Sequence, residues 1–382
     1  MISEILWDIE KVQTPAFVIE ENLLRKNLEQ LVKVKEATGC KILLAQKAFS
    51  MFYFYPLMAK YLDGTTASGI YEARLGYEHF GKETHVFSPA YRSEELTELL
   101  PICDHLIFNS FSQWQYYKKE ALASGKSFGL RINPECSTQE GHDLYDPCSP
   151  GSRLGIVLSD FVGQDLTGIE GLHFHTLCEQ NADDLAVTLK VVEEKFGSYL
   201  HQMKWLNFGG GHHITRSDYD LGTLIDCIQY IKRTYNLEVY LEPGEAVALN
   251  AGYLVAQVLD ITQNYGITNA ILDTSATCHM PDVLEMPYRP EIMGSGRAQE
   301  KAFTYRFGGP TCLAGDIIGD YSFDTPLQIG DKVIFCDMAI YSFVKTNTFN
   351  GMPLAKLMAV DANHQLKIVK SFHYEDFKSR LS

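Results

Sequence analysis

Residues Lys41 to Ser50 read KILLAQKAFS, and this stretch indicates the fold of most of the chain. Its apolar run, Ile42 to Ala45, is typical of a strand buried on both faces of a parallel sheet. A single cation, Lys47, follows the run. Burial readily shifts the pKa of such an ammonium group, and the neutral amine forms a Schiff base with an aldehyde. Lys47 therefore either caps a strand in water or acts as a nucleophile, and the stretch alone leaves both readings open.

Strand and helix patterns alternate from Lys41 to about residue 245. Most of the apolar runs are followed by a segment with the spacing of an amphipathic helix. Eight such units predict a (β/α)8 TIM-type barrel rather than an open doubly wound sheet. Residues 133–152, where Pro, Gly, Cys and Ser crowd together, are predicted to form a long loop at the barrel mouth. The predicted strands begin with KILLAQKAF and continue at 65–70, 84–89, 105–109, 128–134, 168–176, 204–211 and 238–245.

After about residue 250 the pattern changes to strands without intervening helices. Apolar stretches at 253–261, 270–272, 332–335, 354–360 and 365–369 are separated by turn signals such as Gly330-Asp331. The sequence thus predicts an α/β protein with a barrel over residues 16–250 and a C-terminal β domain over 251–382. We expect residues 1–15 to join the β domain.

Composition limits the class of partner. A net charge of −15 argues against nucleic acid or an anionic membrane and suits a cationic substrate. The chain has 9 cysteines without a C-x-x-C pair, and its acidic start, MISEILWDIE, does not resemble a signal peptide. Reduced thiols and a cytoplasmic location are therefore expected. No apolar run approaches the roughly 20 residues of a membrane span.

Residues with useful chemistry follow the predicted barrel strands, whose carboxyl ends share one face. Gly209 to Gly211 offer three backbone N–H groups ahead of a helical segment, which favours either an anion nest for phosphate or a simple tight turn. Glu242, in the sequence EPGE, could pair with a protonated ring nitrogen or with a structural cation. The other strand-end residues are Lys47, Ser68, Arg131 and His175.

Two further residues have more than one interpretation. His175 could stack on a flat ring or lie in the core. With His173, Cys178 and Glu179 nearby it matches no known metal spacing, so no metal is expected. Cys312, in GGPTCLAGD of the β domain, could be a proton donor or a buried thiol.

Taken in order, these motifs resemble one family. The order is a lysine on the first strand, ASGxxE at Ala67 to Glu72, the strand-end His175, GGG, EPG, GPTCxxGD and a tyrosine after a small residue. This order resembles the fold type III pyridoxal-phosphate (PLP) decarboxylases, the alanine racemase-like group, along nearly the whole chain. The resemblance favours Lys47 as the Schiff-base lysine over the simple cap.

The resemblance also implies roles for the other residues. Glu242 would keep the pyridine nitrogen protonated, and His175 would stack on the ring. Cys312 would protonate the product carbon, reaching the partner subunit's barrel in a homodimer with shared active sites. The residues implied to bind the cofactor and its phosphate are Ser68, Gly209, Gly210, Gly211, Gly244 and Tyr341, and Arg153 lies where the family often keeps a basic residue near the site.

Two departures from the family's sequence pattern narrow the choice of substrate. EPGE carries Glu245 where ornithine and diaminopimelate enzymes have arginine, and Leu313 follows the cysteine where they have an acid that grips the substrate. Both departures, and the stretch LDTSATCHMPDVLEMPYRPEI, resemble carboxynorspermidine (carboxyspermidine) decarboxylases. The expected substrate is therefore a carboxypolyamine. The residues expected at its binding site are Asp273, His279, Arg289, Asp316 and Arg153.

Three other functions are less well supported. Diaminopimelate decarboxylase is disfavoured by Leu313. A racemase would use a tyrosine as second base where this family has Cys312. A non-catalytic PLP-binding protein would lack the β domain. The sequence does not separate carboxynorspermidine from carboxyspermidine, which differ by one methylene, because such a difference is worth only about 1–3 kcal/mol.

Overall fold

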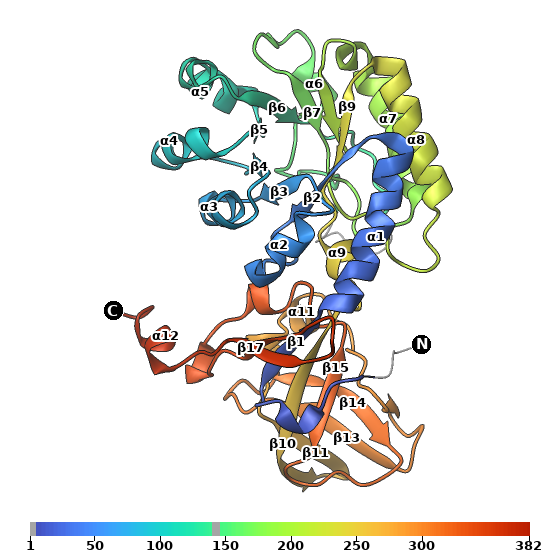
Figure 1. Cartoon of the computed structure of the whole chain (residues 1–382), viewed down its shortest axis with the longest axis vertical. Helices are drawn as coiled ribbons and strands as arrows, with labels where there is room; N and C mark the ends of the chain where they lie inside the picture. The colour runs from blue at the N-terminus through green and yellow to red at the C-terminus, as the bar shows by residue number, and fades with distance from the viewer. Residues whose placement is uncertain (1–4, 140–145) are drawn as a thin grey trace. The chain divides into compact units, whose positions relative to one another are not determined.

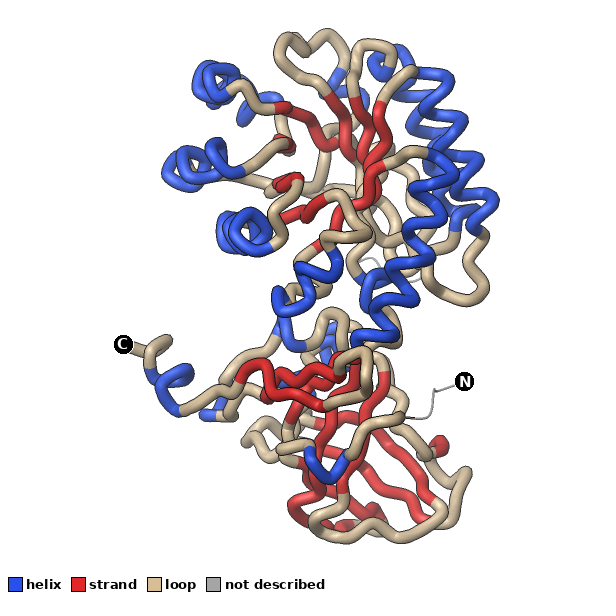
Figure 2. The backbone as a smooth tube through the Cα atoms, viewed as in Figure 1, coloured by secondary structure: helices blue, strands red, loops and turns tan. Residues whose placement is uncertain are grey.

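The computed structural model describes residues 5–139 and 146–382, which divide into two compact units. One unit is residues 26–247, and the other combines residues 1–25 with 248–382. Figure 2 shows strands alternating with helices in the first unit and mostly strands and loops in the second. Among the described residues, every helix is too short or too polar to span a bilayer.

The first unit contains the predicted closed barrel of parallel strands, β2 to β9 in chain order. Neighbouring strands pair all the way round, and β9 closes onto β2 through Lys41 opposite Tyr240. Figure 1 labels these strands. The barrel strands are β2 (Lys41–Ala45), β3 (Gly64–Ala67), β4 (Glu83–Phe87), β5 (His105–Phe108), β6 (Ser127–Arg131), β7 (Gly171–His173), β8 (Trp205–Asn207) and β9 (Glu238–Leu241).

The helices of this unit begin and end at residues suited to those positions. Ser110 accepts a hydrogen bond from the backbone of Gln113 at the start of α5 (Phe111–Ser124), and Gly125 ends that helix in the left-handed conformation. Asp220 caps α8 (Leu221–Tyr235) in the same way. The others are α1 (Glu21–Thr38), which begins in the other unit, α2 (Tyr55–Met58), α3 (Ile70–His79), α4 (Ser93–Ile102), α6 (Leu158–Phe161), α7 (Ala182–Leu200) and α9 (Glu245–Ala248), which ends at the boundary of the two units.

Trp205 is a buried aromatic residue of the barrel. It packs with Leu43, Ile107 and Tyr240 in one buried cluster. A Cβ atom added to Gly171 would lie 2.0 Å from the Trp205 ring, so only glycine fits at that position beside the indole. The described parts of the predicted loop 133–152 contain no helix or strand, and residues 140–145 lie outside the described range.

The second unit is a mostly antiparallel sheet in the order β12-β14-β13-β11-β10-β1-β16-β17, with β15 paired to β10. Its N-terminal strand β1 pairs antiparallel with β10 and parallel with β16. These hydrogen bonds place β1 in the sheet, and residues 1–25 belong to the same compact unit, which corrects the expectation that the barrel begins at residue 16. The strands are β1 (Ala16–Glu20), β10 (Gly252–Asn264), β11 (Ile267–Leu272), β12 (Gly296–Arg297), β13 (Phe303–Gly308), β14 (Ile317–Phe323), β15 (Lys332–Cys336), β16 (Lys356–Val360) and β17 (Leu366–Lys370), with short helices α10 (Ala276–His279), α11 (Asp282–Glu285) and α12 (Tyr374–Lys378).

Candidate active site

Lys47 lies in the turn just after β2, two residues beyond its last residue, Ala45. Its side chain is accessible to solvent, yet protein atoms surround it on most sides. This burial, together with the positive charge of Arg131, lowers the pKa of Lys47, and the carboxylates of Glu242 and Glu72 oppose the shift. A larger fraction of the amine is therefore neutral, which suits a Schiff-base lysine.

Glu242 follows β9 and is buried, with 6% of its surface exposed. Asn207 Nδ2 donates to one carboxylate oxygen at 2.8 Å, and His173 Nε2 lies 3.3 Å from the other. Burial alone would raise the pKa of Glu242, but His173 and Asn207 outweigh it and lower the pKa to about 2. The carboxylate therefore stays charged at neutral pH and can hold a proton on a neighbouring ring nitrogen.

His175 lies two residues past β7, and its ring is fixed by backbone contacts. The N–H of Gly210 donates to Nδ1 at 2.8 Å, so the neutral ring carries its proton on Nε2. Burial, and then the charges of Lys47 and Arg131, hold the pKa of His175 well below its usual value. Its imidazole is neutral, as a residue stacked on a flat cofactor ring can be.

Arg131 ends β6, buried beside the residues just described. Its guanidinium donates to the carbonyl of His175 at 3.0 Å and lies 4.6 Å from the centre of the Phe87 ring. Burial lowers the pKa of Arg131 to about 10 against the opposing charge of Glu242, so it remains a cation. Arg153, exposed on the loop after β6, is close enough to Arg131 for their charges to repel.

The glycine turn after β8 is forced by close packing. Gly209 and Gly211 have φ values of 69° and 84°, and a Cβ on Gly211 would lie 2.0 Å from the Leu177 carbonyl oxygen. The expectation of three bare N–H groups is wrong in this structure, because Asn207 accepts from Gly209 and His175 accepts from Gly210. The next helix, α8, begins only at Leu221 rather than directly after the turn.

The second glycine-containing turn packs onto the Lys47 turn. A Cβ on Gly244 would lie 2.6 Å from the Cβ of Ala48 and 3.2 Å from that of Ala45. The Pro243 carbonyl also accepts from the backbone N–H of Ala45. A side chain at position 244 would thus displace the turn that carries Lys47.

Glu72 belongs to this site although the sequence analysis assigned it no role. Its carboxylate accepts from the backbone N–H of Ser68, which is exposed just after β3, at 2.6 Å. Burial raises the pKa of Glu72, and the Ser68 bond and the charge of Lys47 oppose this shift. The motif ASGIYE contained the signal, because it places a carboxylate one helical turn after a strand end.

Three residues expected to contact substrate form hydrogen bonds within the sheet domain. His279 is fully buried, and its ring nitrogens bond Thr274 and the Pro353 carbonyl, both at 2.9 Å. The buried carboxylate of Asp316 accepts from Ser275, Thr277 and Thr311, and that of Asp273 accepts from the backbone of Gln257. All three side chains therefore have partners within the sheet domain, and their contact with substrate stays a prediction.

The remaining predicted residues of the sheet domain are more accessible. Cys312 has an exposed thiol, and its backbone N–H donates to Asn350 Oδ1 at 2.6 Å. The exposed guanidinium of Arg289 lies 4.5 Å from the centre of the Tyr321 ring. Tyr341 is half-buried and has a φ of 45°, a conformation that is uncommon for residues other than glycine.

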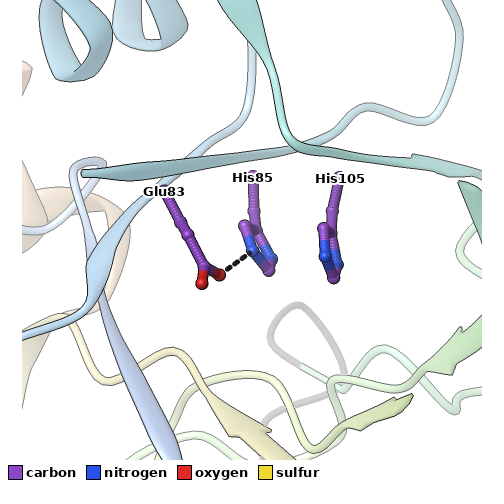
Figure 3. A group of neighbouring side chains, drawn as sticks. All are labelled: Glu83, His85 and His105. Carbon is purple, nitrogen blue, oxygen red and sulfur yellow. Dashed lines mark hydrogen bonds and ion pairs between the residues drawn. The ribbon is translucent and has the colours of Figure 1, made fainter. Parts of the chain in front are cut away.

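A second ionisable group lies at the opposite, amino-terminal ends of the barrel strands. Figure 3 shows Glu83 and His85 of β4 beside His105 of β5. The rings of the two histidines stack with centres 4.0 Å apart, and His85 Nε2 lies 3.1 Å from Glu83. Lys41 also bonds Glu83, so the carboxylate already has a cation, and we assign this group to the packing of the barrel.

Comparison with known proteins agrees with this geometry. A family model described as "Pyridoxal-dependent decarboxylase, C-terminal sheet domain" matches residues 17–339. The chain is 45% identical over 382 residues to carboxynorspermidine/carboxyspermidine decarboxylase of Campylobacter jejuni, covering 97% of this chain and 99% of that protein. It is 42% identical over 374 residues to carboxyaminopropylagmatine decarboxylase of Synechocystis sp., covering 98% and 96%.

A solved structure extends the agreement to three dimensions. The crystal structure of carboxynorspermidine decarboxylase from Campylobacter jejuni, complexed with norspermidine, matches with a TM-score of 0.91 and 44% identity, covering 97% of this chain and all of that one. Diaminopimelate decarboxylases are more distant relatives. The chain therefore belongs to the pyridoxal-dependent decarboxylases, which join a PLP-binding barrel to a C-terminal sheet domain.

Proposed function

We propose that this enzyme uses PLP to remove the carboxylate of carboxynorspermidine or carboxyspermidine, giving norspermidine or spermidine in polyamine biosynthesis. One observation carries the proposal. At one end of the barrel, the amine of Lys47, whose pKa is lowered, lies near the carboxylate of Glu242, which stays charged at neutral pH. The 45% identity to an enzyme named for these substrates supports it.

The residues at this end suit PLP. Bound there, PLP supplies a ring that accepts the electron pair released as CO₂ leaves. Lys47 would bind its aldehyde carbon, and Glu242 would keep its ring nitrogen protonated. The neutral His175 ring would lie against it. A phosphate needs a turn without side chains, which Gly209, Gly210, Gly211 and Gly244 provide, and Ser68 would add a hydroxyl group.

Cys312 is proposed to deliver the proton that replaces CO₂ on the substrate carbon. Its thiol is exposed and lies in the sheet domain, so it is available to a second molecule of this chain. We propose a homodimer in which each Cys312 completes the partner subunit's site. Leu313 beside it is 43% exposed and apolar, so it cannot grip a short diamino acid as a carboxylate would.

A second candidate substrate follows from the relative named carboxyaminopropylagmatine decarboxylase, which is 42% identical to this chain. That substrate carries the same reacting carboxylate but ends in a guanidinium group rather than an amine. We favour the carboxypolyamines because the identity to the enzyme named for them is higher, 45%.

CO₂ release from carboxynorspermidine, carboxyspermidine, carboxyaminopropylagmatine and diaminopimelate, compared by kcat/KM, tests the proposal. We expect the two carboxypolyamines to be the best substrates, with diaminopimelate poor. A higher kcat/KM for carboxyaminopropylagmatine would assign the second candidate, and a higher value for diaminopimelate would contradict the proposal altogether.

A further inference from the structure

Three residues that the proposed mechanism does not use converge beside the two glycine turns. His213 lies two residues after Gly211, and Glu245 directly follows Gly244. Glu179 comes from the loop after β7. We call Glu179, His213 and Glu245 the rim cluster. One carboxylate oxygen or ring nitrogen of each residue lies within 4.8 Å of those of the other two.

Backbone packing fixes these loops together. The N–H of Gln180, next to Glu179, donates to the Gly211 carbonyl, and the N–H of His213 donates back to Gln180. A Cβ on Gly210 would lie 2.5 Å from the Glu242 carbonyl oxygen, so the two glycine turns are in contact. The rim cluster therefore adjoins the turns to which we assign the cofactor's phosphate.

The charges of this arrangement need a cation. A phosphate monoester carries about −1.5 to −2 charge at neutral pH, and two carboxylates beside it would repel it. Arg216, near Glu179, already has other partners, because it donates to Asp218 at 2.6 Å and to the Glu179 carbonyl at 3.2 Å. His213 is the member of the rim cluster that can carry positive charge.

The ring of His213 lacks a full set of partners. Only 6% of the residue is exposed, and neither ring nitrogen makes an aligned hydrogen bond within the described part of the chain. Nε2 lies 3.2 Å from Glu245 Oε2, an ion-pair distance, whereas Nδ1 has no hydrogen-bond partner among residues 5–139 and 146–382. Buried polar atoms usually have a hydrogen-bond partner, so Nδ1 is available to bond a group that binds beside it.

We propose that His213, as an imidazolium held by Glu245, binds the phosphate of PLP and supplies the positive charge of that subsite. The inference rests on the proposed function, since it assumes that PLP lies at the glycine turns. A protonated imidazole has two N–H donors, so it can bond Glu245 and a phosphate oxygen together. Glu245 is then a positioning residue rather than a repelling one.

Binding of PLP and of pyridoxal, which lacks the phosphate, tests the proposal without an activity assay. Apoprotein is titrated with each compound and followed by absorbance and fluorescence. His213→Gln is expected to weaken PLP binding about 10- to 100-fold, the loss typical of one charge-assisted hydrogen bond, and to leave pyridoxal binding unchanged. Adding Glu245→Arg to His213→Gln is expected to recover PLP affinity. His201→Gln, on the barrel surface, is the matched control and should bind PLP like wild type.

Several results would overturn the proposal. PLP affinity at the wild-type level in folded His213→Gln would show that the imidazolium is not needed. Equal losses for PLP and pyridoxal would show that His213 shapes the pocket rather than binding phosphate, and loss of PLP affinity on adding EDTA would show a metal in the rim cluster. Should His213→Gln unfold, the smaller neutral variant His213→Asn serves the same test. Wild-type protein that binds neither compound would instead overturn the proposed function.

Discussion

Gly244→Ala tests whether the two turns around Lys47 must pack as the structure has them. The added Cβ would lie 2.6 Å from the Ala48 Cβ, whereas carbon atoms pack best at about 3.5–4.0 Å. The turn carrying Lys47 must therefore move by about 1 Å, and displacements of that size cost on the order of 10²-fold in rate. We expect kcat/KM to fall about 10- to 100-fold and the free energy of unfolding to fall by about 1–3 kcal/mol.

The assay is CO₂ release from carboxynorspermidine combined with urea unfolding. Gly69→Ala is the matched control, because a Cβ at Gly69 has no neighbour within 4 Å and its extended backbone accepts any residue. Wild-type kcat/KM in a folded Gly244→Ala enzyme would refute the reasoning, since the Lys47 turn would then tolerate the displacement.

Three further predictions address stability and assembly. Gly171→Ala places a Cβ 2.0 Å from the Trp205 ring, so urea unfolding should show a loss of about 1–3 kcal/mol; an unchanged midpoint would contradict the packing of the barrel interior. Burial lowers the pKa of His105 to about 2 from its usual 6.5, so the folded state stays unprotonated while the unfolded chain takes up a proton below pH 6.5. The free energy of unfolding should thus fall as the pH drops below 6.5, by at most about 2 kcal/mol at pH 5. His105→Phe should reduce that fall, and the same pH dependence in the variant and the wild type would contradict the prediction. Mixed Lys47→Ala and Cys312→Ala subunits should recover about a quarter of wild-type activity if each site uses residues from two chains, whereas activity at the mutant level after verified exchange would place both residues in one chain.

Much of the barrel could be predicted because its strands are short apolar runs with regular helical segments between them. Each of the eight predicted strands corresponds to an observed one, from β2 to β9. The sheet domain was predicted less completely: strands β12, β13 and β14 were missed. β13, FTYRFG, alternates aromatic and polar residues as a half-buried strand does, so its signal was present and was not used. β14, IIGDYSF, has a weaker pattern because Gly319 and Asp320 interrupt it.

The site was harder to predict because hydrogen-bond partners depend on tertiary contacts. The sequence indicated which residues end the barrel strands, but not that Asn207 and His175 would accept the N–H groups of the glycine turn. Likewise, His279 and Asp316 lie in polar motifs, and nothing in those motifs indicates that both side chains are buried and fully bonded. Burial of a polar residue is decided by segments distant in sequence.

Trapping the cofactor on Lys47 tests the central claim most directly. Protein reconstituted with PLP is reduced with borohydride, digested and sequenced by mass spectrometry. Because the pKa of Lys47 is lowered and Glu242 lies near it, we expect the phosphopyridoxyl group on the peptide that contains Lys47, and its absence from Lys47→Ala. The same group found on another lysine, with Lys47 unmodified, would contradict the account.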